Sequence, residues 1–254
     1  MAGELDGKTV IVTGAGSGIG KATAFVLARM GANLVLADID ADSVAATAAA
    51  IGNAAVSLQC DVTQEDDVAA MVGKAISHWG RLDGAFNNVG RGGIRKRVAE
   101  MSLDEWRRVQ DVTLNSVFLC LRHEIPALIK SGGGAIVLNA SNGGRAGLPL
   151  MASYGAAKAG VISLAQTTAI EYAAENIRVN AICPGLILTE GLQKMLDAGM
   201  PVAADGGFPS PFVPANRMGK PAEVGEMAAW LISPLASYVT GQVISVDGGA
   251  HATQ

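Results

Sequence analysis

Three side chains near the middle of the chain are of types that can move a proton at an alcohol or carbonyl oxygen. Tyr154 and Lys158 lie four residues apart in a helical pattern, so both project from one helix face. A free phenol has a pKa of about 10, too high for a good base at neutral pH, and a nearby ammonium lowers that pKa. Ser141, at the end of an expected strand, has a hydroxyl that could hold a substrate oxygen beside the phenol. The tyrosine–lysine pair alone is a common pattern, and the serine makes it indicative of acid–base chemistry.

A glycine-rich segment near the start has the pattern of a nucleotide-binding turn. Thr13–Gly20 (TGAGSGIG) joins an expected strand, Lys8–Thr13, to an expected helix, Ile19–Met30. The glycines permit a tight turn, and free N–H groups at the helix start can bind a pyrophosphate. The spacing differs from the general G-x-G-x-x-G fingerprint, so its position between first strand and first helix carries the prediction. We expect cofactor contacts from Gly14, Ser17, Gly18, Ile19 and Gly20.

A carboxylate at the end of the second expected strand indicates which cofactor binds. Asp38 closes the strand Asn33–Asp38, where it can accept hydrogen bonds from both adenosine ribose hydroxyls and repel a 2′-phosphate. The neighbouring Ile39 and Asp40 bring no cation to neutralise such a phosphate. A helix-capping role for Asp38 is the alternative, although Asp40 or Asp42 can cap instead. The sequence therefore predicts NAD(H) rather than NADP(H).

Two further strands end in polar residues that belong to the same edge of a parallel sheet. Asp61 follows the expected strand Ala55–Cys60, and its carboxylate could meet the adenine amino group or cap the next helix. Val62, its neighbour, is also expected to contact the cofactor. Asn88 lies in the turn after the expected strand Leu82–Asn87, and ligands of such folds bind at the carboxyl ends of the strands.

These residues need a scaffold that gathers several strand ends. Short apolar, β-branched runs alternate with longer helical patterns, which indicates an α/β fold with a doubly wound parallel sheet and helices on both faces. No linker, composition shift or repeat divides the chain, so we expect one domain over residues 1–254. The remaining expected strands are Ala135–Ala140, Ile177–Cys183 and Gln242–Val246. The remaining expected helices are Asp42–Ile51, Gln64–Trp79, Ser102–Lys130, Ser153–Ala174 and Pro221–Ile232.

The segment Glu190–Gly219 is the exception to this regular alternation. It has little periodicity and contains the pair Gly206-Gly207. Its prolines are Pro201, Pro209, Pro211 and Pro214. A long irregular stretch in a compact domain is more often functional than a defect. We expect it to form a substrate-binding lid within the single domain.

The composition of the chain limits the kinds of binding partner and the cell compartment that we expect for the protein. The net charge of −4 gives no basic footprint for nucleic acid, and no uncharged apolar run approaches the length of a membrane span. The polar start of the chain does not resemble a signal peptide. The three cysteines are far apart, odd in number and fit no metal spacing. We expect a cytoplasmic protein with buried, reduced thiols, no bound metal, and neither nucleic acid nor membrane as a partner.

Taken together and in order, these motifs resemble those of the short-chain dehydrogenase/reductase family. The resemblance covers nearly the whole chain. It is carried by Thr13-Gly14, Asn87–Gly90, Ser141, Tyr154, Lys158, Asn180, Pro184-Gly185 and Val246–Gly249. It implies a seven-stranded Rossmann-like sheet, hydride transfer at C4 of the nicotinamide, and usually a homotetramer.

The same resemblance implies a role for each matching residue. Tyr154 would be the acid–base, Ser141 would orient the substrate oxygen, and Lys158 would bind the nicotinamide ribose and tune Tyr154. Four residues would flank the nicotinamide, with the last two near its carboxamide: Pro184, Gly185, Ile187 and Thr189. The substrate would be a small-molecule alcohol or ketone, and similarity to bacterial dehydrogenases favours a cyclic or small aliphatic alcohol or diol.

One departure from the family pattern falls in the catalytic machinery. The family's helix before the fifth strand carries Asn-Leu-x-Gly-Val-Phe, whose Asn completes a catalytic tetrad, whereas this chain has Thr113–Phe118 (TLNSVF). Thr113 stands in the place of that Asn, and Asn115 lies about 200° further around a helix. The Thr113 hydroxyl could face the interior near Lys158 and hold a water, or it could bond only to its own helix backbone. Both alternatives stay open.

Two classes of function are compatible with these motifs. The first is an NAD(H)-dependent oxidoreductase that interconverts a secondary alcohol and a ketone. The second is a non-catalytic dinucleotide-binding sensor or scaffold on the same fold. Such a protein has little need for Ser141, Tyr154 and Lys158 together. Two related chemistries fit less well, because sugar epimerases of the extended family use another glycine spacing and enoyl reductases space Tyr and Lys more widely.

Overall fold

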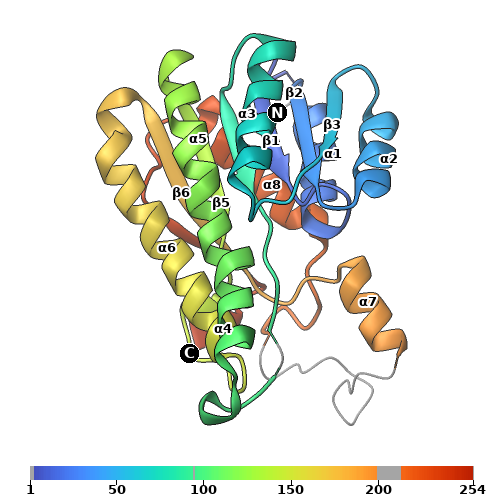
Figure 1. The fold of residues 1–254 in the computed structure, drawn as a ribbon, viewed down its shortest axis with the longest axis vertical. Helices are drawn as coiled ribbons and strands as arrows, with labels where there is room; N and C mark the ends of the chain where they lie inside the picture. Colours follow the sequence, from blue (N-terminus) through green and yellow to red (C-terminus); the bar gives the residue numbers. More distant parts are fainter. Residues whose placement is uncertain (1–2, 94, 199–212, 254) are drawn as a thin grey trace.

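The computed structural model describes residues 3–93, 95–198 and 213–253. Within them, seven parallel strands form one sheet in the order β3-β2-β1-β4-β5-β6-β7 (Figure 1). The strands are β1 (Thr9–Thr13), β2 (Asn33–Asp38), β3 (Ala55–Gln59), β4 (Gly84–Asn87), β5 (Gly134–Asn139), β6 (Ile177–Pro184) and β7 (Val243–Val246). The predicted doubly wound, Rossmann-like sheet is confirmed. The strand order reverses between β1 and β4, the point at which such sheets bind ligands.

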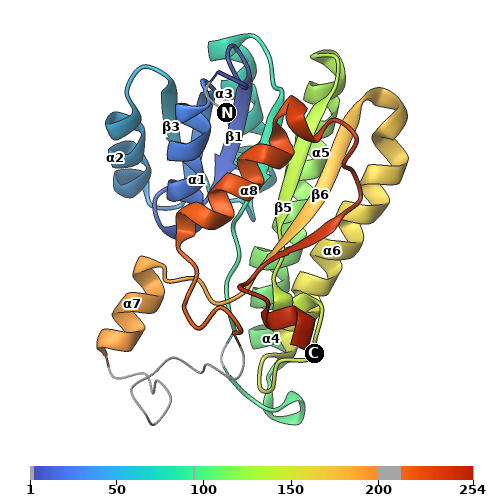
Figure 2. The same ribbon diagram turned by 180° about the vertical axis from the view of Figure 1, so that it is seen from behind.

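Helices cover both faces of the sheet, as predicted. One face carries α1 (Gly18–Arg29), α2 (Ala41–Ile51) and α8 (Pro221–Ile232), seen in Figure 2. The other carries α3 (Glu65–Trp79), α5 (Ser116–Lys130) and α6 (Ala152–Tyr172), seen in Figure 1. In β1, all five residues are buried, with Val10 and Val12 facing one layer and Ile11 the other. Burial on both sides explains why the central strands read as continuous apolar runs.

The long helix predicted over Ser102–Lys130 is continuous but contains an irregular turn. Helix α4 (Leu103–Gln110) is followed by five π-helical residues, Asp111–Asn115, before α5 begins. A π-turn inserts a residue into the helix and frequently marks a functional site. At its end, the Ser116 hydroxyl donates to the carbonyl of Val112 at 2.7 Å.

The helix from Leu103 to Lys130 is also, by length and composition, long and apolar enough to cross a membrane. Half of its apolar window is buried inside the fold, and the core that covers one sheet face includes Val117, Cys120 and Leu121. A core helix passes the same test of length and composition, so this feature does not indicate a membrane partner.

The segment Glu190–Gly219 is less irregular than predicted. Its first eight residues form helix α7 (Glu190–Asp197), whose start is capped by the Thr189 hydroxyl, which accepts from the N–H of Leu192 at 3.2 Å. At the other end, Gly219 pairs with Ile187 in an isolated parallel bridge. Residues 199–212, with three of the four prolines, lie outside the described residues, so a lid stays a prediction.

Candidate active site

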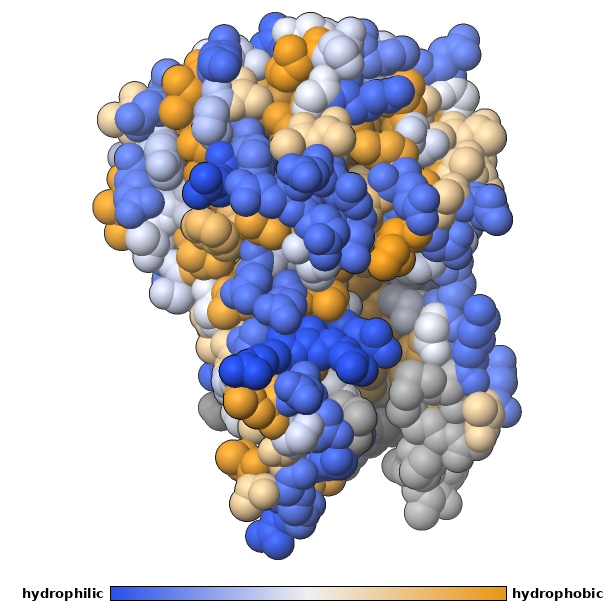
Figure 3. Space-filling view, viewed as in Figure 1, coloured by the Kyte–Doolittle hydropathy of each residue, from blue (hydrophilic) through white to orange (hydrophobic). Residues whose placement is uncertain are grey.

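An open cavity of about 720 Å³ lies at the carboxyl ends of the central strands. It lies between the π-turn, through Val112, and α7, through Gly191, and Figure 3 shows this face hollowed between α4 and α7. Every predicted site residue lines it except Gly20 and Thr113. The volume is in the range of small-molecule and cofactor pockets.

The glycine-rich turn has the geometry that an approaching phosphate needs. Gly14 and Gly18 adopt positive φ angles of 65° and 53°, which side chains disfavour. A Cβ on Gly20 would lie 2.0 Å from the carbonyl oxygen of Gly14, so Gly20 serves close packing behind the turn rather than lining the cavity. Ser17 is the N-cap of α1 but makes no side-chain capping bond, which leaves its hydroxyl for a ligand.

Asp38 lies against this turn. One carboxylate oxygen accepts from the N–H of Gly16 at 2.9 Å, and the other accepts from the N–H of Asp40 at 3.0 Å. The cap of α2 is Asp40, which accepts from the N–H of Ser43 at 3.1 Å, so the capping alternative for Asp38 is wrong. Each carboxylate oxygen has capacity for a further hydrogen bond, which suits two ribose hydroxyls.

Asp61 and Val62 line the far end of the same cavity. Asp61 accepts from the N–H and the hydroxyl of Thr63, at 3.0 and 2.8 Å. The N-cap of α3 is Gln64, so the alternative in which Asp61 caps that helix is wrong. The contact of Asp61 with an adenine amino group stays a prediction.

Ser141, Tyr154 and Lys158 meet on one wall of the cavity. The Lys158 Nζ atom lies 5.9 Å from the centre of the Tyr154 ring. Burial raises the pKa of Tyr154 above its ordinary value, and the hydrogen-bonding influence of the Ser141 side chain offsets part of that rise. The lower pKa predicted from the lysine charge is wrong, because the loss of water around the phenol outweighs that charge.

Lys158 is a buried ammonium with most of its hydrogen-bonding capacity unused. Its side chain is 3% exposed, and burial lowers its pKa to about 8. Among the described residues its hydrogen-bond acceptor is the carbonyl oxygen of Asn139, at 2.5 Å. An ammonium has three donors, so two remain for ligands in the cavity that Lys158 lines.

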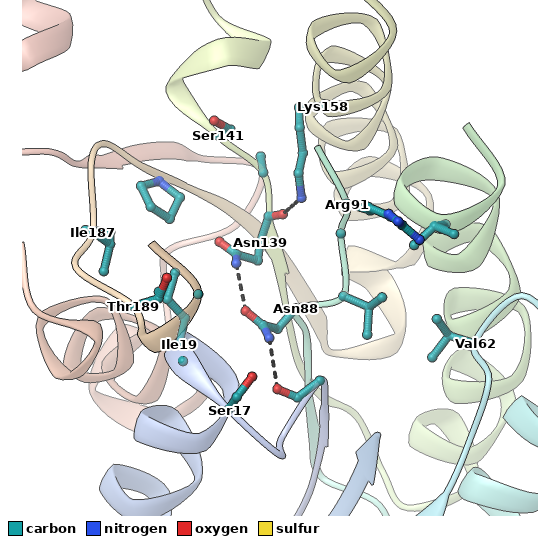
Figure 4. Close-up of a pocket in the computed structure, with 18 of the residues that line it drawn as sticks. Ser17, Ile19, Val62, Asn88, Arg91, Asn139, Ser141, Lys158, Ile187 and Thr189 are labelled. Atoms are coloured by element: carbon teal, nitrogen blue, oxygen red, sulfur yellow. Dashed lines mark hydrogen bonds between the residues drawn. The ribbon is translucent and has the colours of Figure 1, made fainter. Parts of the chain in front are cut away.

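Asn139 was not predicted as a site residue, yet it links the lysine to the glycine-rich turn. Its amide donates to the side-chain oxygen of Asn88 at 2.8 Å, and the Asn88 amide donates to the carbonyl of Thr13 at 3.2 Å. Figure 4 shows the hydrogen bonds that run from Lys158 to Asn139 and from Asn139 to Asn88. The available signal was a polar residue at the end of an apolar strand, two positions before Ser141.

Thr113 is fully buried in the π-turn, and its hydroxyl bonds outside its own helix. The hydroxyl accepts from the N–H of Arg91 at 3.1 Å and donates to the carbonyl of Arg91 at 3.2 Å. Bonding only to its own helix backbone is therefore wrong. The loop it holds passes close to Lys158, since a Cβ on Gly90 would lie 2.9 Å from the Lys158 Nζ atom. Holding a water is still a hypothesis.

The four residues expected around the nicotinamide lie at the end of β6 and after it, and all of them line the cavity. Pro184 is the last residue of the strand, and Gly185, Ile187 and Thr189 lie between it and α7. A Cβ on Gly185 would lie 2.7 Å from the Cβ of Asp247, which explains the glycine there. The cavity thus has a glycine-rich turn, a carboxylate, a tyrosine, a lysine and an apolar wall in one continuous surface, which suits a dinucleotide beside a small substrate.

Comparison with known proteins gives close matches over the full length of the chain. A family model described as enoyl-(acyl carrier protein) reductase matches residues 14–251. The 2,5-dichloro-2,5-cyclohexadiene-1,4-diol dehydrogenase of Sphingobium indicum is 40% identical over 98% of this chain and 99% of its own. The cyclohexanol dehydrogenase of Acinetobacter sp. strain SE19 is 39% identical over 98% and 96%. A crystal structure described as a short-chain dehydrogenase/reductase from Burkholderia xenovorans superposes with a TM-score of 0.92, at 34% identity and 99% coverage of both chains.

Proposed function

Because this chain belongs to the short-chain dehydrogenase/reductase family of oxidoreductases, which use a nicotinamide dinucleotide, we propose that it is an NAD(H)-dependent dehydrogenase of a cyclic secondary alcohol. The observation that carries the proposal is that Ser141, Tyr154 and Lys158 line one cavity with Asp38. The cytoplasmic location expected from the composition belongs to the same proposal, as does the homotetramer that the family resemblance implies. Light scattering of the purified protein tests the tetramer.

In this proposal each residue of the cavity has a defined task. Bound nicotinamide would accept or supply the hydride. Ser141 would hold the substrate oxygen by a hydrogen bond, and Tyr154 would take the hydroxyl proton during alcohol oxidation or return it during ketone reduction. Lys158 would bind ribose hydroxyls with its two unused donors, and its charge would stabilise the phenolate. The Asp38 carboxylate would accept hydrogen bonds from the hydroxyls of the adenosine ribose.

The substrate class rests on the relatives. The two curated relatives described above act on ring alcohols, a cyclohexadienediol and cyclohexanol. A screen of cyclic and open-chain secondary alcohols with NAD⁺, and of the matching ketones with NADH, tests the proposal by absorbance at the NADH band. We expect turnover of ring alcohols to exceed that of open-chain alcohols. Equal or better turnover of open-chain alcohols would contradict the ring preference.

Two other functions can be tested alongside this screen. Tight NADH binding without turnover of any alcohol or ketone would favour the non-catalytic sensor or scaffold. The description of the matching family model favours an enoyl reductase as the second candidate, and NADH-dependent reduction of an enoyl thioester would reveal it. The four-residue spacing of Tyr154 and Lys158 argues against that chemistry. In the enoyl reductases of the family that this chain resembles, the tyrosine and the lysine are further apart in the sequence.

The double variant Asp38→Ala/Ile39→Arg should shift the cofactor preference from NAD(H) toward NADP(H). It removes a carboxylate that repels the 2′-phosphate and supplies a guanidinium that can bind phosphate in a fork. Ile39 is exposed and lines the cavity beside Asp38. We expect the ratio of kcat/KM values for the two cofactors to move by about 10–100-fold, the value of one charge-assisted bond. Asp42→Ala, which removes one nearby negative charge, is the control for the loss of the Asp38 charge. A wild-type preference for NADPH would contradict the role of Asp38.

Thr113→Val should lower turnover, and Thr113→Ser should restore it. Valine keeps the shape but leaves the N–H and carbonyl of Arg91 without their hydroxyl partner, at a cost of about 1–3 kcal/mol in the free energy of unfolding. Urea unfolding and kcat from pH 6 to 9 measure both effects. A loss of stability with unchanged kcat at every pH would make Thr113 a structural residue and leave a Ser-Tyr-Lys triad.

A further inference from the structure

An acidic side chain of α7 lies on the turn that is proposed to bind the cofactor's phosphates. One carboxylate oxygen of Glu190 accepts from the backbone N–H of Gly18 at 3.0 Å, and the other lies 4.0 Å from the Lys21 Nζ atom. Thr189 lies against the same turn, since a Cβ on Gly18 would be 3.3 Å from its Cγ2 atom. Figure 1 shows α7 apart from the helical layers, so this contact joins it to the body of the fold.

The contact occupies a position that favours any anion. Gly18 is the first residue of α1, whose first N–H groups have no partner within the helix and whose dipole favours negative charge. Among the described residues, the Glu190 carboxylate accepts from one of these groups, whereas the Ser17 hydroxyl does not cap the helix. The carboxylate thus stands where a bound phosphate would find its donors.

A dinucleotide diphosphate and the Glu190 carboxylate cannot share this end of α1. Both are acceptors, so a phosphate oxygen that binds the Gly18 N–H must displace the carboxylate oxygen. Both are also negative, and two like charges a few ångströms apart repel each other even near solvent. Lys21 is the nearby cation at this point, and the carboxylate already lies beside it.

We propose that Glu190 is an internal competitor for the cofactor's diphosphate, so that dinucleotide binding and the contact of α7 with Gly18 exclude each other. The inference rests on the proposed function, because it requires the phosphates to bind at the glycine-rich turn. Linkage makes the effect reciprocal: the bound cofactor weakens the attachment of α7, and the attachment weakens cofactor binding by the same factor. Glu190 therefore lowers affinity for the cofactor.

A simpler role for Glu190 makes the opposite prediction. Acids are common in the first turn of a helix, and Glu190 could do no more than stabilise the start of α7. Its side chain is 57% exposed, where an ion pair contributes little to stability. In that role, removing its charge would loosen α7 and leave cofactor affinity unchanged or weaker.

The test compares Glu190→Gln with Asp197→Asn by isothermal titration calorimetry. Both variants remove one negative charge from α7, but Asp197 lies at the far end and bonds to Gln193 at 2.8 Å. Ligands are NADH, ADP-ribose, which keeps the diphosphate, and adenosine, which lacks it. For Glu190→Gln we expect Kd values for NADH and ADP-ribose to fall about three- to tenfold, with adenosine unchanged. Asp197→Asn should bind all three ligands as the wild type does.

Three results would overturn the proposal. One is an unchanged or higher Kd for ADP-ribose in Glu190→Gln, and another is an equal gain in Asp197→Asn, which would reflect net charge alone. The third is a gain for adenosine as large as that for ADP-ribose. If the wild type binds neither NADH nor ADP-ribose, the proposed function fails and the competitor role fails with it. If the wild type binds both and Glu190→Gln binds no tighter, only the competitor role fails.

Discussion

Tyr154→Phe is expected to lower kcat by about 10²–10⁴-fold, the usual contribution of general acid–base catalysis, while Kd for NADH stays close to the wild-type value. The phenyl ring fills the same space on the cavity wall but can neither accept nor return a proton. The expected loss is large because the cavity brings Ser141 and Lys158 beside this ring.

The measurement is turnover of a ring alcohol with NAD⁺ and of its ketone with NADH, alongside a fluorescence titration of NADH. Tyr172→Phe is the matched control, because Tyr172 ends the same helix, α6, and packs at the edge of the core. Retention of more than about a tenth of wild-type kcat by Tyr154→Phe would rule out Tyr154 as the acid–base.

The direction of the pKa shift adds a pH dependence to this result. Burial raises the pKa of Tyr154, so the phenol is protonated at neutral pH until other charges oppose the shift. Alcohol oxidation needs the phenolate and ketone reduction needs the phenol, so oxidation should rise and reduction should fall as the pH increases. In Tyr154→Phe the residual rates should lose this dependence.

Much of the fold could be predicted because local pattern and tertiary environment agree. Strand β1 (TVIVT) has three β-branched apolar residues in a row and is buried on both sides, which is what a central parallel strand requires. Helix α7 was missed because eight residues give little periodicity. The π-turn was missed because its Thr113 is bonded to Arg91, 22 residues away in the sequence.

The candidate site could be predicted where its residues are close in sequence. Tyr154 and Lys158 share one helix, and Gly14 and Gly18 share one turn. The link from Asn139 through Asn88 to Thr13 runs across three strands that are neighbours in the sheet but distant in the chain. Spacing within a sequence does not reveal such contacts, because they depend on the order of the strands.

Lys158→Met is expected to abolish most turnover, to weaken NADH binding and to raise the melting temperature at neutral pH. The ammonium has two donors free for ribose hydroxyls, and losing hydrogen bonds from a charged group costs about 1.5–3 kcal/mol, or about 10–100-fold in Kd. Fluorescence titration of NADH measures the binding. An unchanged Kd would contradict the ribose contact, and exposed Lys130→Met is the control.

The stability change has a predictable dependence on pH. Burial lowers the pKa of Lys158 from 10.5 to about 8 in the folded protein, so between these values the unfolded chain binds more protons. The free energy of unfolding of the wild type therefore rises with pH through this window. Below pH 8 it is lowered by the full desolvation penalty of the buried charge. Methionine fills similar space without charge and should stabilise the fold by about 1–2 kcal/mol at pH 7, roughly 3–6 °C in Tm. The difference in Tm between variant and wild type should shrink as the pH approaches 10. A difference that stays constant from pH 7 to 10 would mean that burial does not destabilise the charged form of Lys158.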